Sequence, residues 1–153
     1  MRRLARVRPA ACRVMYHTAM SAAAVSVLMY DETPGHGRTA PVKLELVSER
    51  ITVRQLIESR VRREVEAINQ APSKEFHTLV QPTDAERTLN GFKLRKPKPI
   101  DADAQCALAF DAFKRNGFFL LVDDRQVEDL DEEIVVGADT EVGFFKLVPL
   151  VGG

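Results

Sequence analysis

The sequence predicts a single α+β domain in which a helix lies across a sheet, and three observations support this prediction. The stretches 25–30 and 42–47 alternate apolar and polar residues, as half-buried strands do. The stretch 51–69 then repeats its apolar residues at helical spacing. Two later apolar stretches, 118–122 and 142–148, are short and bounded by turn residues, which predicts further strands.

Composition narrows the class of protein. A chain of 153 residues with 45% hydrophobic and 29% charged residues fits one globular domain with its own core. Lys+Arg and Asp+Glu are balanced at 22 each, so no global charge favours a nucleic-acid partner. No apolar run approaches the roughly 20 residues of a membrane helix, so we expect no membrane partner. Two scattered cysteines, Cys12 and Cys106, indicate a reducing compartment, and we expect a cytoplasmic protein.

The range 1–23 differs from the rest of the chain. It contains five arginines, no acid occurs before Asp31, and Pro9 interrupts any helix. We expect this range to lie outside the fold, either as a disordered extension or as an organelle-targeting segment. Met20 is a natural alternative start of translation. The arginines are Arg2, Arg3, Arg6, Arg8 and Arg13.

The fold is expected to begin with an antiparallel hairpin, because the two alternating stretches flank a loop, 33–40, that contains one proline and two glycines. The helix over 51–69 follows. Thr52 and Gln55 have capping-box spacing, in which each side chain binds a free amide at the helix start. The charged residues of this helix predict a solvated face, with a docking face as the alternative. They include Arg60, Arg62, Arg63, Glu64 and Glu66.

The range 70–99 loses this long periodicity and holds four prolines, so we interpret it as an insertion. Within it, Thr83 and Glu86 again have capping-box spacing and Asn90-Gly91 resembles a helix stop, which predicts a short helix over 84–90. The basic stretch 93–98 is broken by proline. We expect it to be extended and exposed, as a solubilising linker or a contact for an acidic partner.

A second helix is expected over 102–115, with Asp101 or Asp103 as its N-cap. Cys106 lies on its apolar stripe with Ala109 and Phe113, which favours a core role over a catalytic thiol.

The last third of the chain should complete the sheet. The range 118–122 predicts a central strand, Asp123-Asp124 a turn, and the acidic stretch up to residue 139 a short crossover. In the final strand the alternation is interrupted, and it leaves open which side chains face inward. The two sets are Val142, Phe144 and Val148, or Phe145 and Leu147.

No catalytic or metal-binding constellation appears in the sequence. His17, His36 and His77 are far apart and lack ligand spacing to carboxylates or cysteines. We therefore expect no enzyme activity, no bound metal and no bound cofactor.

The C-terminal stretch EVGFFKLVPLVGG is the candidate functional segment. A strand leads into an apolar tail that ends on Gly152 and Gly153, and glycines at this position have no turn to make. Such a tail can enter a narrow channel and present its carboxylate to a partner's active site. The alternative is a loose end without function. A partner would recognise the residues before the glycines, which are Leu147, Val148, Pro149, Leu150 and Val151.

The order of hairpin, capped helix, insertion, short helix, strand, crossover and last strand with Gly-Gly resembles the β-grasp fold of ubiquitin-like proteins. The segment GFFLLVDDRQVEDLDEEIVVGADTEVGFFKLVPLVGG is similar to the closing half of the bacterial sulfur carriers of molybdopterin and thiamine synthesis. The resemblance implies a mixed sheet, one β-grasp domain over 24–151 and a functional tail, 152–153. The apolar tail lacks the arginines of the ubiquitin tail, and the range 70–99 departs from the compact form of both groups.

In this family a ubiquitin-activating-type enzyme adenylates the terminal glycine with ATP and magnesium. The resemblance therefore implies that Gly153 is the activated residue and that a target amine accepts it, as in a protein modifier. One alternative is a sulfur carrier with a C-terminal thiocarboxylate, whose partner would be a sulfur-accepting enzyme. A second alternative is a non-covalent β-grasp interaction module.

Overall fold

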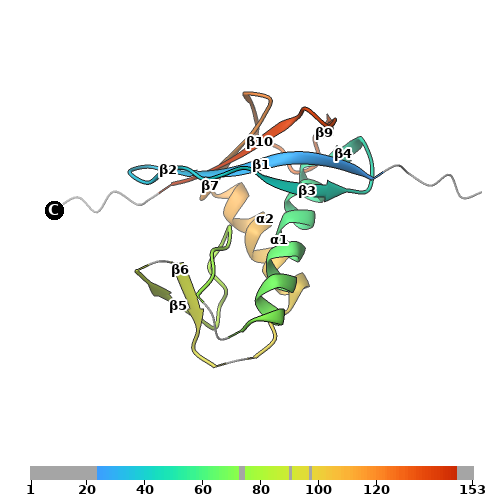
Figure 1. Cartoon of the computed structure of the whole chain (residues 1–153). Helices are drawn as coiled ribbons and strands as arrows, with labels where there is room; N and C mark the ends of the chain where they lie inside the picture. The colour runs from blue at the N-terminus through green and yellow to red at the C-terminus, as the bar shows by residue number, and fades with distance from the viewer. Residues whose placement is uncertain (1–23, 73–74, 90, 97, 148–153) are drawn as a thin grey trace, which may run out of the picture.

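The computed structural model describes residues 24–72, 75–89, 91–96 and 98–147. The predictions for the range 1–23, for Val148 to Val151 and for Gly152 and Gly153 therefore fall outside the described residues. Over these residues the protein is an α+β structure with a mixed sheet and two helices (Figure 1).

The main sheet is built around two inner strands that lie side by side and run parallel, β1 (Val25–Thr33) and β10 (Glu141–Lys146). On the far side of β1, β3 (Val42–Leu46) pairs antiparallel with it and completes the predicted hairpin. On the far side of β10 lie β7 (Phe118–Val122) and then β8 (Arg125–Val127), both antiparallel to their neighbours. The order β3–β1–β10–β7–β8 is compatible with a β-grasp.

Shorter strands complete the sheet structure. β2 (Gly37–Arg38) extends the pairing along the same edge of β1 as β3. β4 (Arg50–Thr52) pairs with β9 (Glu133–Val135), and β5 (Ala85–Thr88) pairs with β6 (Gly91–Leu94), in two separate ladders.

Both main helices begin as the sequence predicts. Helix α1 spans Val53–Gln70, and the Oγ1 of Thr52 accepts from the amide of Gln55 while the Gln55 side chain accepts from the Thr52 amide. Helix α2 spans Ala102–Lys114, and the carboxylate of Asp101 accepts from the two amides that follow Ala102. The two capping predictions are confirmed, because caps depend on residues close in sequence.

The main core lies between the sheet and the two helices. The rings of Phe113 of α2, Phe118 of β7 and Phe144 of β10 pack against one another in turn at tilted angles, with centroids 5.6 and 6.2 Å apart. Val142 and Phe144 of the first candidate set of the last strand are fully buried and face inward, whereas Leu147 of the second set is exposed. Val148, the third residue of the first set, lies outside the described residues. Cys106 is buried in this core, as predicted. Burying each large apolar side chain stabilises the fold by about 1.5–3 kcal/mol.

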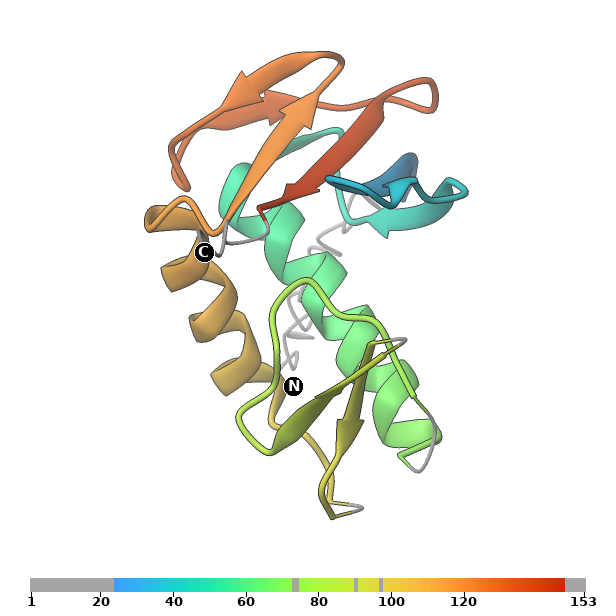
Figure 2. The ribbon, with the colours of Figure 1, turned by 90° about the vertical axis from the view of Figure 1, so that its left-hand side faces the viewer.

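Helix α1 does not lie flat across the sheet. In both ribbon views its first half packs beneath the sheet and its second half runs away toward the β5–β6 hairpin (Figures 1 and 2). Its buried residues accordingly divide between two cores. Val53 to Val65 join the main core, whereas Ile68 packs with Ala85 and Leu94 in a second, small core.

The prediction of a short helix over 84–90 is wrong, because Ala85–Thr88 within this range forms strand β5, which pairs antiparallel with β6. Asn90-Gly91, interpreted as a helix stop, is also a hairpin signal. The hairpin is favoured because the pair Ala85 and Leu94 can then be buried against Ile68. Leu94 is only 6% exposed, so the stretch 93–98 is not exposed throughout, while Leu79 lies in the main core. Leu79, Ala85 and Leu94 therefore tie the described part of the predicted insertion to the cores that the helices help to form.

Candidate functional site

The candidate site is the end of β10, where the chain leaves the sheet toward its C-terminal tail. Lys146 is the last residue of β10 and pairs with Phe118 of β7. The next amide, that of Leu147, reaches the carbonyl of Gly117 at 3.5 Å, and the Leu147 side chain is 47% exposed. Of the predicted tail-recognition residues the structure describes only Leu147, which lies at the surface, and the recognition role of all five residues stays a prediction.

An ionic cluster lies beneath this exit, between the sheet and α1. The guanidinium of Arg60 binds both carboxylate oxygens of Asp31 on β1, and its Nε donates to Glu64 at 2.9 Å. The Nζ of Lys146 lies 3.3 Å from the same Asp31 carboxylate. Arg60 also stacks on the ring of Phe144, with its Cζ 4.1 Å from the ring centroid. We call Asp31, Arg60, Glu64 and Lys146 the exit cluster.

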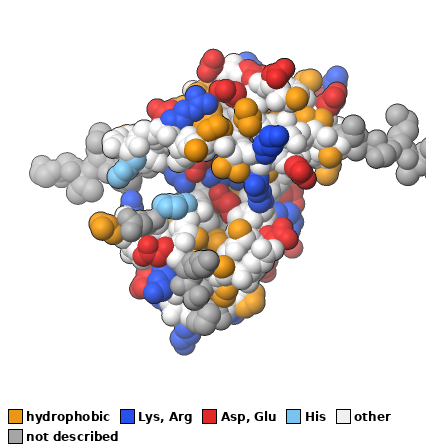
Figure 3. Space-filling model, viewed as in Figure 1, with side chains coloured by type: hydrophobic (Ala, Val, Ile, Leu, Met, Phe, Trp, Pro, Cys, Tyr) orange, Lys and Arg blue, Asp and Glu red, His pale blue; other side chains and the backbone are white. Residues whose placement is uncertain are grey.

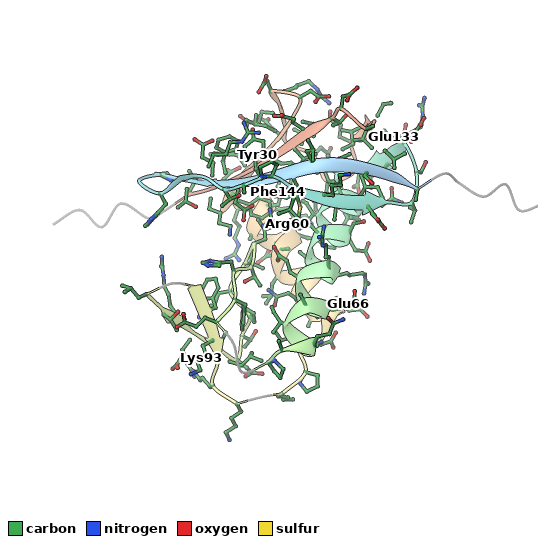
Figure 4. All side chains as sticks on the ribbon, in the orientation of Figure 1. Tyr30, Arg60, Glu66, Lys93, Glu133 and Phe144 are labelled. Atoms are coloured by element: carbon green, nitrogen blue, oxygen red, sulfur yellow. The ribbon has the colours of Figure 1, made fainter. Side chains whose placement is uncertain are left out.

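The prediction of a solvated face is wrong for two charged residues of α1. Arg60 is only 4% exposed and Glu64 is 13% exposed, and Figure 4 shows Arg60 below the sheet beside Phe144. Burial is possible because each charge has an opposite partner and the guanidinium has an aromatic face to cover. Helical spacing alone hides this arrangement. The acid in the apolar alternation of β1, Asp31, was the available signal.

The electrostatics of the cluster follow from this burial. Burial by itself raises the pKa of Asp31, but the hydrogen bonds and charge of Arg60, with the charge of Lys146, outweigh it and hold that pKa below its usual value. For Arg60, burial lowers the pKa, and Glu64 and Asp31 together raise it above its ordinary value. Asp31 and Arg60 therefore carry opposite charges at neutral pH.

A groove opens beside the exit on the other face of the sheet, away from the helices. It encloses a cavity of about 300 Å³. Its apolar lining comes from strand positions that alternate with buried ones, such as Phe119 and Leu121 beside the buried Leu120. The lining residues are Glu32, Pro34, Phe119, Leu121, Gln126, Phe145, Lys146 and Leu147.

Next to this groove, a glycine lets two aromatic residues lie against the sheet. A Cβ on Gly143 would come within 2.8 Å of the Phe145 ring and 2.7 Å of the Tyr30 hydroxyl, so only glycine fits without displacement. Arg38 covers the Tyr30 ring at 3.3 Å, and Figure 4 shows Tyr30 on the opposite side of the sheet from Arg60. Sequence reasoning missed this surface. The unbroken apolar run of β7 was the signal, because a strand that is apolar at every position has two apolar faces.

Among the described residues, no group of histidine, cysteine and acidic side chains could hold a metal ion. Burial raises the pKa of the Cys106 thiol, which disfavours the reactive thiolate. On the face shown in Figure 3, acidic and basic side chains are interspersed, without a patch of one sign.

None of the helices within the described part of the chain has the length and apolarity needed to cross a membrane. Comparisons with models of known families, with curated proteins and with solved structures found no match to this chain.

Proposed function

We propose that this protein is a ubiquitin-like modifier of the β-grasp type, whose Gly153 carboxylate is adenylated and then joined to a target amine. The observation that carries the proposal is the position of β10. It is an inner strand, parallel to the first strand of the chain, and it leads directly into the apolar tail that ends on Gly152 and Gly153. In the β-grasp interpretation, β3, β1, β10, β7 and β8 are the five strands of the fold.

The chemistry requires no catalytic group on this chain. A carboxylate oxygen of Gly153 attacks the α-phosphorus of ATP, and pyrophosphate leaves with magnesium bound. A lysine amine of the target then attacks the acyl carbon, loses its proton to a base of the enzyme and expels AMP. The protein supplies a thin tail without side chains at its end and a surface for the activating enzyme. The exposed Leu147 and the adjoining groove at the exit support such a surface.

The test traps the acyl adenylate. Full-length protein is incubated with an extract of its native cells, ATP, magnesium and hydroxylamine, and mass spectrometry looks for a hydroxamate on Gly153. We expect the hydroxamate only when ATP is present. Deletion of Gly152 and Gly153 should abolish it, and Gly153→Asp should reduce it by adding bulk and charge. A matched control that starts at Met20 loses residues from the other end and should react like the full chain.

The same spectra separate the proposal from its alternatives. Trypsin cleaves after Lys146, so a remnant of Leu147 to Gly153 on lysines of other proteins supports the modifier. A C-terminus in which sulfur replaces an oxygen supports the sulfur carrier instead. If the wild-type chain gives no hydroxamate in an extract that adenylates another substrate of this type, the proposed function is wrong and the interaction module is the better account.

A further inference from the structure

The side chain of Lys146 is fixed on the inner side of the sheet, immediately before the tail. Its Nζ donates to the carbonyl of Thr78 at 2.9 Å and lies 3.3 Å from Asp31. The side chain is 24% exposed. A lysine at the last position of a strand would ordinarily extend its ammonium into water. Here the ammonium joins two parts of the fold that are far apart in sequence.

The carbonyl that Lys146 contacts belongs to a firmly held loop, residues 78–80. Thr78 is only 2% exposed, and its hydroxyl donates to the carbonyl of Val80 at 2.8 Å. The amide of Leu79 donates to Glu64 of α1 at 3.0 Å, and Gln105 of α2 donates to the same Val80 carbonyl at 2.8 Å. Both helices therefore fix the position of this loop.

The second partner of Lys146 is equally fixed. Asp31 lies in the middle of the cluster and is bound through two oxygens by the buried Arg60. The anchors of Lys146 thus reach β1, α1 and the loop 78–80. By contrast, the backbone hydrogen bond of the next residue, Leu147 to Gly117, is long at 3.5 Å. Among the described residues, Lys146 is the last whose side chain makes close polar contacts with the rest of the fold.

We propose that Lys146 is a positioning residue that, together with the loop 78–80, holds in place the end of β10 and Leu147, which we call the tail root. This inference deepens the proposed function and, in its consequence for activation, rests on it. It also gives the range 70–99 a role, since this range supplies the loop that holds the tail root. Fixing the root reduces the entropy that a partner must remove when it captures the tail. Loss of the contacts of Lys146 with Thr78 and Asp31 should weaken binding of the tail by the activating enzyme and leave the chemistry at Gly153 unchanged.

The first test does not depend on the proposed function. Amide hydrogen exchange is measured by NMR in wild type, Lys146→Met and Lys146→Arg, with Lys43→Met as the matched control because the Lys43 side chain is exposed on β3. We expect Lys146→Met to speed exchange at Leu147 by about tenfold, as for a local opening that has become easier. Val27 in β1 should keep its wild-type rate. Lys146→Arg should restore most of the protection, and Lys43→Met should change nothing.

Two outcomes of this test overturn the inference. Equal exchange at Leu147 in wild type and Lys146→Met would mean that the contact does not hold the root. Faster exchange throughout the sheet, Val27 included, would mean that Lys146 acts on overall stability instead. Thr78→Val offers a second variant, since it removes the hydroxyl that fixes the loop and should give a smaller increase at Leu147.

The second test measures the consequence for activation by hydroxamate trapping at increasing protein concentration. We expect Lys146→Met to raise the concentration that gives half-maximal trapping, with the maximal rate unchanged. An unchanged half-maximal concentration overturns the link between position and capture. If wild type itself is never trapped, the proposed function fails, while the exchange data still decide whether Lys146 positions the tail root.

Discussion

Helix α1 carries two arginines, two residues apart, whose local pairings are nearly the same and whose surroundings are opposite. Arg60 donates to Glu64 at 2.9 Å and Arg62 donates to Glu58 at 2.8 Å, each across one helical turn. Arg60 is 4% exposed, whereas Arg62 is 47% exposed. Arg60 faces the sheet and binds Asp31, and Arg62 faces outward and binds Asp103 of α2.

Because the pairing distances are alike and the exposures are not, we expect the environment to determine what each ion pair contributes to stability. In water, a charged pair is screened and gains little over its solvated charges. In a buried cluster each charge has lost its water, so the partners become necessary to one another. The exit cluster should therefore be sensitive to single changes, and the outward pairs of α1 should not.

The largest effect is expected for Arg60→Ala. This change leaves Asp31 and Glu64 buried without their main partner and uncovers the face of Phe144. We expect the free energy of unfolding to fall by about 3–5 kcal/mol, the usual cost of breaking a buried pair. Urea unfolding at pH 7 measures it. A loss below about 1 kcal/mol, as found for exposed pairs, would show that water reaches the cluster and would remove the contrast between the two arginines.

A smaller effect is expected for Asp31→Asn, with a characteristic dependence on pH. The variant keeps the shape of the side chain but loses its charge, so we expect a cost of about 1.5–3 kcal/mol at pH 7, the range for hydrogen bonds to charged groups. The folded-state pKa of Asp31 lies below its ordinary value of 3.8. Its ionisation therefore stabilises the fold fully above that value, and this contribution is lost as the pH falls through the lowered pKa.

Urea unfolding between pH 7 and pH 2 tests this dependence. The stability difference between wild type and Asp31→Asn should shrink as the pH falls below 3.8. Asp124→Asn is the matched control, because Asp124 is exposed in the β7–β8 turn and should follow wild type. A difference that stays constant down to pH 2 would mean that the charge of Asp31 contributes nothing and that the variant acts through packing.

Contacts between residues close in sequence could be predicted, whereas contacts that depend on tertiary packing could not. The capping box of Thr52 and Gln55 and the β1–β3 hairpin were predictable, because their partners are close in sequence and their patterns have few alternatives. The burial of Arg60 was not, since it depends on Asp31, 29 positions earlier, and on the angle at which α1 leaves the sheet. The β5–β6 hairpin was missed because Asn90-Gly91 suits two kinds of chain reversal.

In the candidate site, too, the tail residues could be named from the sequence, whereas the contact of Lys146 with Thr78 could not. Leu147 is exposed, and its role in recognition stays a prediction. The roles of Val148 to Gly153 also stay predictions, because those residues lie outside the described ranges. The anchor of Lys146 on Thr78 could not be predicted, since it joins positions 68 residues apart through a backbone carbonyl that no side-chain pattern marks.

The smallest effect is expected for Arg62→Ala, and it tests the other side of the comparison. Arg62 has two acidic partners at short distance, Glu58 and Asp103, so a count of contacts would rank it beside Arg60. Asp103 is 82% exposed, however, and its side chain must give up conformational freedom to keep the contact. We expect the melting temperature to equal that of wild type within error at physiological salt, because exposed ion pairs contribute about 0–1 kcal/mol and are weakened by salt. At low salt a small difference in melting temperature between Arg62→Ala and wild type should appear, because screening is then weaker. The effect of Arg60→Ala should be the same at both salt concentrations.

The comparison fails if Arg62→Ala lowers the melting temperature as much as Arg60→Ala does. That result would mean that the link from α1 to Asp103 holds α2 in place, and that surface exposure does not measure what an ion pair contributes in this protein.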